Sequence, residues 1–236
     1  GLFTSTDRGL VERIRRGEPI TVEELVAGRD ALAAAILRAG GLLRFGQTHL
    51  RPGSVRPAPD AAEDTRPRTL FEKIIARHRL ATPVTPAQPR AGQGSFVRAD
   101  WRFIHEYYTG MAAHMLRGQL GDAFTLHDAG SIVVFEDHSS YMDESPAHLR
   151  AGLVPNMVAM CEVQRRFVAT HGLRQHRTLT DAEAGADDGR NVAGISHAMM
   201  AEHYALPGQV VVGTDSHTPH SGALGCVAFG VGTTDM

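Results

Sequence analysis

The stretch Gly213-Thr214-Asp215-Ser216-His217-Thr218-Pro219 directly follows a run of three valines. It contains three consecutive side chains that can hold or move protons. Glycine and other small residues fill most of the positions from there to the last residue. A short valine run is typical of a buried strand, and open α/β sheets bind ligands at the carboxyl ends of their strands. Packing does not explain three polar residues in a row at such a place. The stretch therefore predicts an α/β sheet with a functional site at Asp215, Ser216 and His217.

Strands and helices alternate along the middle of the chain. The pattern predicts strands at 101–104, 131–135 and 209–212, and helices at 109–118 and 154–171. The strands are largely apolar, and the longer helix carries apolar residues at helical spacing. Strands that are apolar on both faces and alternate with helices are typical of a mainly parallel sheet covered on both sides. The predicted fold class is α/β, with three α/β/α layers around a mainly parallel sheet and a helical segment in front.

The amino-terminal part carries a different pattern. A Thr-x-x-Glu capping box at 21–24 begins an apolar-periodic run that continues to about residue 38, which predicts one helix. Residues 51–68 are rich in proline and charge, which predicts a linker. A second capping box at 69–72 begins a helix that runs to about residue 78. The predicted domains are an accessory helical segment at 1–50, a linker at 51–68 and the α/β/α domain at 69–236.

The charge balance points away from polyanionic partners. Lysine plus arginine number 24 and aspartate plus glutamate number 26, so no positive field draws the chain to nucleic acid or to an anionic membrane. No apolar run approaches the roughly 20 residues that span a bilayer, and no signal-peptide pattern opens the chain. We expect a soluble, cytoplasmic protein without nucleic-acid or membrane partners.

The two cysteines, Cys161 and Cys226, lie far apart and outside any Cys-x-x-Cys or Cys/His spacing. This arrangement argues against both a disulfide framework and a zinc site. We expect both to be small buried residues and not metal ligands.

Other candidate site residues lie at or near the ends of predicted elements. Asp137 and His138 directly follow the strand at 131–135, and a carboxylate beside an imidazole makes the ring a usable general acid near neutral pH. His105 closes the first strand, and His197 follows an acidic loop that contains glycine. Taken singly, each position is also explained by solvated loop residues or by a hydrogen-bonded structural histidine.

Two kinds of hydrolase are rival hypotheses for these side chains. A Ser-His-Asp hydrolase is disfavoured because adjacent Ser216 and His217 side chains are expected to diverge, and no Gly-x-Ser-x-Gly segment is present. A zinc or iron hydrolase built from histidine and aspartate lacks the usual His-x-x-x-His signature. Both alternatives stay open.

The order of the segments resembles that of the aconitase and 3-isopropylmalate dehydratase large-subunit family. The similarity covers the chain from about residue 70 onward and leaves out residues 1–68. The segments that carry it are Leu70-Phe71-Glu72-Lys73-Ile74-Ile75, Ile132-Val133-Val134-Phe135-Glu136-Asp137-His138, Gly194-Ile195-Ser196-His197 and, most specifically, the run from Gly213 to Asp235.

This resemblance implies a hydro-lyase or isomerase that dehydrates and rehydrates a hydroxy di- or tricarboxylic acid, such as isopropylmalate, citrate or a homologue. Members of the family work at a 4Fe-4S cluster that acts as a Lewis acid. By the same resemblance, Asp137 and His138 would form the pair that protonates the leaving hydroxyl.

The remaining roles follow from the resemblance in the same way. His197 and His217 would hydrogen-bond the departing water, and Asp215 would orient these groups. Ser216 would bind a substrate carboxylate. His105 stands where aconitases place a substrate-binding glutamine, so it would contact the substrate as well.

The sequence departs from the family in its cysteines. The family places three cluster cysteines downstream of the Asp-Ser-His segment, and this chain has none there. We therefore expect the cluster ligands beyond Met236, no metal ligand within the chain, and a fragment that is inactive alone. Its partner would be a carboxy-terminal swivelling domain or a separate small subunit. The alternatives are a truncated, non-catalytic domain kept for binding or assembly, and the His/Asp metal hydrolase.

Overall fold

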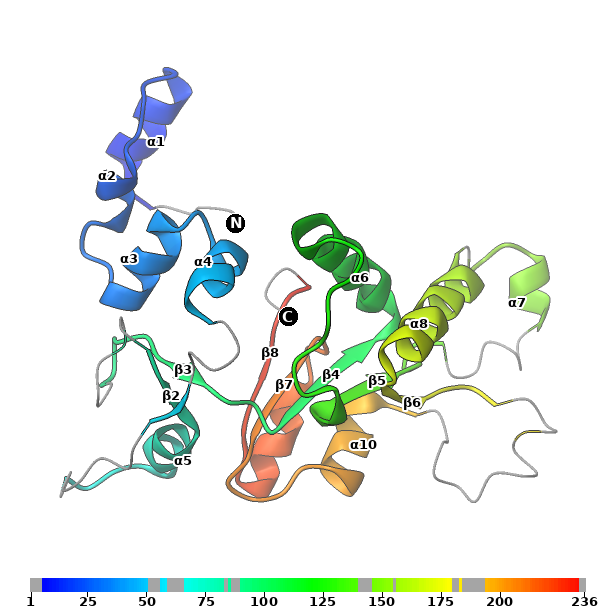
Figure 1. Cartoon of the computed structure of the whole chain (residues 1–236). Helices are drawn as coiled ribbons and strands as arrows, with labels where there is room; N and C mark the ends of the chain where they lie inside the picture. The colour runs from blue at the N-terminus through cyan, green and yellow to red at the C-terminus, as the bar shows by residue number, and fades with distance from the viewer. Residues whose placement is uncertain are drawn as a thin grey trace. The chain divides into compact units, whose positions relative to one another are not determined.

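The computed structural model of the chain (Figure 1) separates into two units, Gly1–Arg98 and Ala99–Met236. Each unit has its own sheet. No helix in the part of the chain that the structure describes is long and apolar enough to cross a membrane. The described residues are 6–50, 56–58, 66–82, 85, 90–139, 146–154, 156–179, 183 and 194–233.

The first unit begins with four short helices, α1 (Arg8–Arg15), α2 (Val22–Val26), α3 (Ala31–Arg38) and α4 (Leu42–His49). The prediction of one helix from the first capping box to residue 38 is wrong. Gly28 has a φ of +74°, which ends α2, and Asp30 then accepts hydrogen bonds from the backbone N–H groups of Leu32 and Ala33. This second N-cap begins a separate helix.

The rest of the first unit is a helix and a small antiparallel sheet of order β1-β2-β3. These elements are α5 (Leu70–His78), β1 (Arg56–Pro57), β2 (Arg79–Ala81) and β3 (Phe96–Val97). The capping box predicted at 69–72 is confirmed, since Thr69 and Glu72 bond reciprocally to each other's backbone N–H. Residues 51–55 and 59–65 lie outside the described part, and the division at 51–68 stays a prediction.

The second unit is built on five strands in the order β6-β5-β4-β7-β8, and every neighbouring pair is parallel. This sheet confirms the predicted fold class. The three predicted strands are present to within one residue at each end, whereas β6 and β8 were not predicted. The strands are β4 (Trp101–His105), β5 (Ile132–Phe135), β6 (Arg174–His176), β7 (Val210–Gly213) and β8 (Val227–Gly230).

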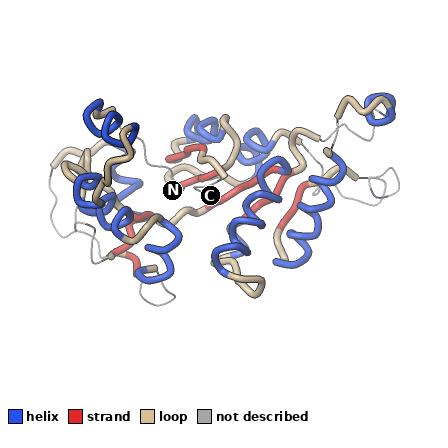
Figure 2. Tube along the Cα trace, turned by 90° about the horizontal axis from the view of Figure 1, so that it is seen from above, coloured by secondary structure: helices blue, strands red, loops and turns tan. Residues whose placement is uncertain are grey.

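Helices cover both faces of this sheet. The elements besides the strands are α6 (Glu106–Leu120), α7 (Pro146–Arg150), α8 (Met157–His171), α10 (Ser196–His203) and two 3-10 helices, η1 (Ala129–Ser131) and η2 (Thr218–Leu224). Figure 1 shows α6 and α8 over one face and α10 on the other, and Figure 2 shows α6 and α8 side by side. The result is the predicted α/β/α arrangement.

The central strands are unbroken apolar runs because both of their faces are buried in the core. Successive side chains of a strand point to opposite faces, and here both faces are buried. Phe103, Phe135 and Val211 pack with Met200 of α10. On the other face, a second cluster combines strand residues with α6 and α8, namely Ile104, Ile132, Val134, Ala113 and Phe167.

Two helix boundaries differ from the prediction. The helix predicted at 109–118 begins at Glu106, directly after β4, and continues through Gly118 to end before Gly121, whose φ is +81°. The helix predicted at 154–171 begins later, because Asn156 has a left-handed φ of +67°. Its predicted end before Gly172 is confirmed.

Strands β4 and β7 approach each other closely at Gly213. A Cβ at this position would lie 2.3 Å from the ring of Phe103, which is fully buried. Gly213 pairs with Phe103 in register. Only glycine fits there without displacing the aromatic ring.

Candidate functional site

The strand order places a crevice between the carboxyl ends of β4 and β7. From β4 the chain passes through α6 to β5 on one side, whereas from β7 it passes through η2 to β8 on the other. Ligands bind in open α/β sheets where the connections leave neighbouring strands in opposite directions. His105 ends β4 and Asp215 follows β7, so both candidates predicted from sequence stand at this crevice.

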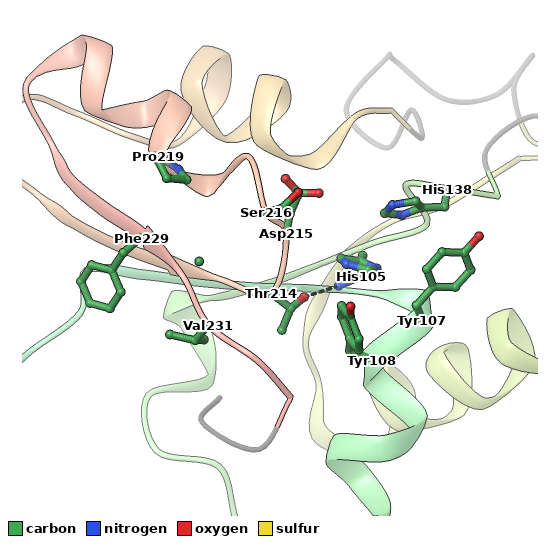
Figure 3. A pocket seen from close by; sticks show the side chains of 11 residues that line it. His105, Tyr107, Tyr108, His138, Thr214, Asp215, Ser216, Pro219, Phe229 and Val231 are labelled. Carbon is green, nitrogen blue, oxygen red and sulfur yellow. Dashed lines mark hydrogen bonds between the residues drawn. The ribbon is translucent and has the colours of Figure 1, made fainter. Parts of the chain in front are cut away.

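An open pocket of about 740 Å³ occupies this crevice (Figure 3). Four predicted site residues line it, and Figure 3 shows an aromatic side chain on each side of them, Tyr107 and Phe229. The full lining is His105, Tyr107, Tyr108, His138, Thr214, Asp215, Ser216, Pro219, Phe229, Gly230 and Val231.

Asp215 is the centre of one group of side chains. Its Oδ1 accepts the backbone N–H of His217 at 2.6 Å and lies 3.3 Å from Nδ1 of His197 and 3.6 Å from Nδ1 of His217. The two imidazoles stack with their ring centres 4.9 Å apart. Asp215 itself is 6% exposed. The structure thus brings His197, a separate candidate, to the predicted Asp215-Ser216-His217 site, and it makes the carboxylate the shared neighbour of both rings.

Asp137 and His138 form a second group at the end of β5. The Asp137 carboxylate accepts a hydrogen bond from the Ser196 hydroxyl at 2.7 Å, and its backbone N–H donates to Glu106 at 2.9 Å. His138 Nδ1 lies 3.8 Å from the Asp137 carboxylate, beyond hydrogen-bond distance. The predicted pair is therefore adjacent, but Asp137 is held by residues of α10 and α6.

His105 connects the two groups. Its ring lies 4.5 Å from the ring of His138, and its backbone N–H donates to the Thr214 hydroxyl at 3.4 Å. Burial, with a contribution from the nearby His138, lowers the pKa of His105 from its usual 6.5 to about 4. The imidazole is therefore neutral at pH 7. A neutral ring keeps one N–H donor for a bound hydroxyl or carboxylate.

The buried, neutral His105 predicts a pH dependence of stability. Above about pH 6.5 the ring is neutral in both the folded and the unfolded chain, so stability does not change through this group. As the pH falls from about 6.5 to about 4, the unfolded chain takes up the proton first, and stability is lost by roughly 2–3 kcal/mol.

This prediction is checked by urea unfolding of the chain and its His105→Gln variant between pH 7.5 and pH 4. The variant should lose less stability over this window, because glutamine does not titrate. Glu106, whose pKa is raised by burial, is present in both proteins and cancels from the comparison. Parallel stability profiles for the two proteins would contradict a depressed pKa at His105.

The expectation that Ser216 and His217 diverge is wrong. Ser216 Oγ lies 3.2 Å from Nδ1 of His217, and both side chains are exposed. A catalytic triad nevertheless needs the hydroxyl and the carboxylate on opposite ring nitrogens. Here Asp215 and Ser216 both approach Nδ1. The arrangement therefore lacks the relay that activates a serine nucleophile.

The cysteines do not fit an iron–sulfur cluster. Cys161 is buried with its Sγ 3.2 Å from Ser139 Oγ, and Cys226 is buried and donates to the Leu206 carbonyl. Burial raises the pKa of both thiols, whereas cluster ligands are thiolates. Two separate thiols do not make a cluster ligand set. Ligand atoms of His197, Asp215 and His217 do lie within 4.8 Å of one another, close enough to share one cation.

Sequence reasoning missed several residues of the pocket. Tyr107 and Tyr108 follow His105 in the first turn of α6, and Phe229 and Val231 come from and after β8, which was not predicted. An aromatic pair directly after a strand-end histidine was the only available signal. Ser196 was quoted only as part of a motif, and its hydrogen bond to Asp137 spans 59 positions.

Comparison with known proteins identifies what this arrangement is similar to. A model of the aconitase family (aconitate hydratase) matches residues 72–236. The chain is 27% identical over 169 residues to 3-isopropylmalate dehydratase large subunit 1 of Archaeoglobus fulgidus, which covers 72% of this chain and 34% of that protein. It is 30% identical over 171 residues to the methanogen homoaconitase large subunit of Methanocaldococcus jannaschii, which covers 71% and 33%.

A shorter stretch is more similar to aconitases. Over 43 residues the chain is 56% identical to the mitochondrial aconitate hydratase of Schizosaccharomyces pombe, covering 18% of this chain and 5% of that protein. The chain spans about a third of the length of the large subunits that it matches.

Proposed function

Because the chain belongs to the aconitase family, we propose that it forms the proton-donating part of a hydro-lyase that removes water from a hydroxy di- or tricarboxylic acid and adds it back. The observation that carries the proposal is the convergence of His105, His138 and Asp215 on one pocket at the carboxyl end of the sheet. His197 and His217 adjoin the same carboxylate.

In the proposed dehydration, each of these residues has a separate role. His138 protonates the hydroxyl that leaves, and Asp137 holds the strand end on which His138 stands. Neutral His105 donates a hydrogen bond to the bound acid. Asp215 orients the rings of His197 and His217 toward the departing water.

Ser216, exposed at the mouth of the pocket, binds a substrate carboxylate. A 4Fe-4S cluster, when bound, supplies a Lewis acid for the substrate hydroxyl. The cysteines of this chain do not fit it, so we place its ligands outside the chain.

The substrate class and the partner follow from the same family. We infer a substrate of the isopropylmalate, citrate or homocitrate kind, and a partner that is either a carboxy-terminal swivelling domain or a separate small subunit. The relatives over most of this chain are named as large subunits, which supports a partner of one of these two kinds. By itself the chain is expected to be inactive.

The proposal is tested by assaying the full-length protein with each of these acids and following the ultraviolet absorbance of the unsaturated product. We expect turnover of one acid, and a loss of about a hundredfold or more in a His138→Asn variant. Failure of the full-length protein, with its cluster intact, to dehydrate any of them would favour the alternative of a non-catalytic domain that serves in binding or assembly.

A second candidate function is a hydrolase that uses one metal ion. The close approach of His197, Asp215 and His217 ligand atoms favours it. Metal analysis of the purified chain distinguishes the two, since the hydro-lyase predicts no tightly held ion on this part of the protein. One zinc or iron ion per chain that survives dialysis, together with hydrolytic activity, would favour the hydrolase.

A further inference from the structure

Glu106 is a buried carboxyl group that the proposed steps do not use. It is the first residue of α6 and follows His105 directly, at the edge of the pocket. The residue is 1% exposed. A carboxyl group that is removed from water in this way needs partners that offset the cost of burial.

The two carboxyl oxygens of Glu106 face different residues of the same pair. Oε2 accepts the backbone N–H of Asp137 at 2.9 Å. Oε1 lies 4.0 Å from Nδ1 of His138 and has no hydrogen-bond partner among the residues that the structure describes. One side chain thus reaches both the backbone of Asp137 and the ring of His138.

Asp137 is less able to serve the His138 ring, although it is the neighbour in sequence. Its Oδ2 already accepts the Ser196 hydroxyl at 2.7 Å and lies 3.8 Å from Nδ1 of His138. Oε1 of Glu106 lies at nearly the same distance from that nitrogen, and the neighbouring Ser139 hydroxyl also acts on the Glu106 carboxyl group, where it lowers the pKa.

We propose that Glu106 is a positioning residue for the proton donor, an inference that rests on the proposed function. Its Oε2 fixes the Asp137 backbone, and its Oε1 orients the His138 ring. The carboxyl group acts through His138 and does not itself line the pocket.

The environment of Glu106 favours a proton on this carboxyl group. Burial raises its pKa, against the opposing effect of the hydrogen bond from the Asp137 N–H. At 4.0 Å, the contact of Oε1 with Nδ1 of His138 is electrostatic and not a hydrogen bond, so it strengthens when the carboxyl group ionises. The other charged or titratable groups that face His138 are Asp137, His105, Tyr107 and Asp215.

The test uses NMR on the folded chain, with ¹³C-labelled glutamate carboxyl groups and ¹⁵N-labelled histidine rings. As the Glu106 carboxyl signal titrates, the Asp137 amide signal and the His138 ring signal should both show a step at the same midpoint. In Glu106→Gln, which keeps an oxygen acceptor for the Asp137 N–H, that step should vanish from both signals.

A purely structural role gives a different result. If Glu106 only anchors the backbone, the Asp137 amide will show the step and the His138 ring will not, and the proposal is then overturned. Should Glu106→Gln fail to fold, Glu106→Asp provides the second variant. It retains the carboxyl group one methylene further back, and the step in the His138 ring should persist with a smaller amplitude.

Glu136→Gln is the matched control. Glu136 is equally buried, at 1% exposed, but its carboxylate pairs with Arg165 at 2.6 Å and accepts the Thr178 N–H at 2.8 Å. This variant also removes a buried carboxylate from the same end of the sheet, and it should lower the melting temperature. In Glu136→Gln, the titration step shared by Glu106 and His138 should remain. If the step disappeared in this variant too, it would report a general loss of stability and not a specific contact of Glu106.

The NMR result does not depend on enzymatic activity, so it separates this proposal from the proposed function. In the full-length enzyme, Glu106→Gln should lower kcat about tenfold or more and alter the pH profile of kcat, with KM nearly unchanged. If the His138 ring shows the titration step of Glu106 but the full-length protein is inactive, the positioning role of Glu106 is supported and the hydro-lyase function is contradicted. If the Glu106→Gln enzyme is fully active with an unaltered pH profile, the positioning role of Glu106 is contradicted and the hydro-lyase function is not.

Discussion

Replacing Asp215 by asparagine is expected to lower kcat of the full-length hydro-lyase by about a thousandfold, with a much smaller effect on KM. The Asp215 carboxylate lies within 3.6 Å of Nδ1 of both His197 and His217, and it accepts the His217 backbone N–H. An amide keeps the size and one acceptor but loses the charge that both rings share. Both histidines then lose the negative charge that lies within 3.6 Å of their Nδ1 atoms.

The measurement is steady-state kinetics of the variant with the preferred acid, beside thermal unfolding to show that the fold is kept. Asp100→Asn is the matched control. Asp100 accepts the Val210 N–H at 2.9 Å at the amino end of the same strand pair, far along the strands from the pocket. It should lose some stability and keep kcat. Equal kinetic losses in the two variants would contradict a specific role for Asp215.

Replacing Gly213 by alanine is expected to destabilise the second unit by about 3 kcal/mol. The added methyl group would lie 2.3 Å from the ring of Phe103, which is fully buried and cannot move into solvent. Relief would require β7 to move away from β4, and Asp215 follows two residues after Gly213. Urea unfolding of the chain measures the loss.

A smaller side chain at position 103 tests the cause. Phe103→Leu alone should also destabilise the chain, because it leaves a cavity beside Phe135. The double variant Gly213→Ala, Phe103→Leu should be more stable than the sum of the two single losses predicts, because the leucine leaves room for the methyl group. Additive losses would show that the clash with Phe103 is not the source of the effect.

The central strands were predictable because they are buried on both faces. Residues 132–135 and 210–212 are unbroken apolar runs, and such runs have few alternatives to a covered parallel sheet. The outer strands were not predictable for the opposite reason. Arg174–His176 is polar, and Val227–Gly230 is a short run bordered by glycines, so neither was singled out as a strand. Their pairing with the neighbouring strands makes them strands.

The site was predictable as a set of residues but not as a network. Asp215 and His138 were identified from their places at strand ends, His197 from its place after an acidic loop, and all three from the family resemblance. That Glu106 holds the Asp137 N–H, across 31 positions, follows from the parallel alignment of β4 with β5 and not from any local pattern. The contact between Ser216 and His217 was misjudged because sequence adjacency does not determine side-chain rotamers.

The pairing of β4 with β7 also has a consequence for how the pocket is made. Asp100 and Val210, which close the amino end of this pair, lie 110 positions apart, whereas β4, β5 and β6 follow one another along the chain. Closing so long a loop costs more entropy than the successive pairings before it. A growing chain that has passed β6 already contains three of the five strands of this sheet and His138, but it does not yet contain Asp215. The pocket therefore forms only after the long-range pairing of β4 with β7 and the pairing of β7 with β8, which supplies Phe229 and Gly230.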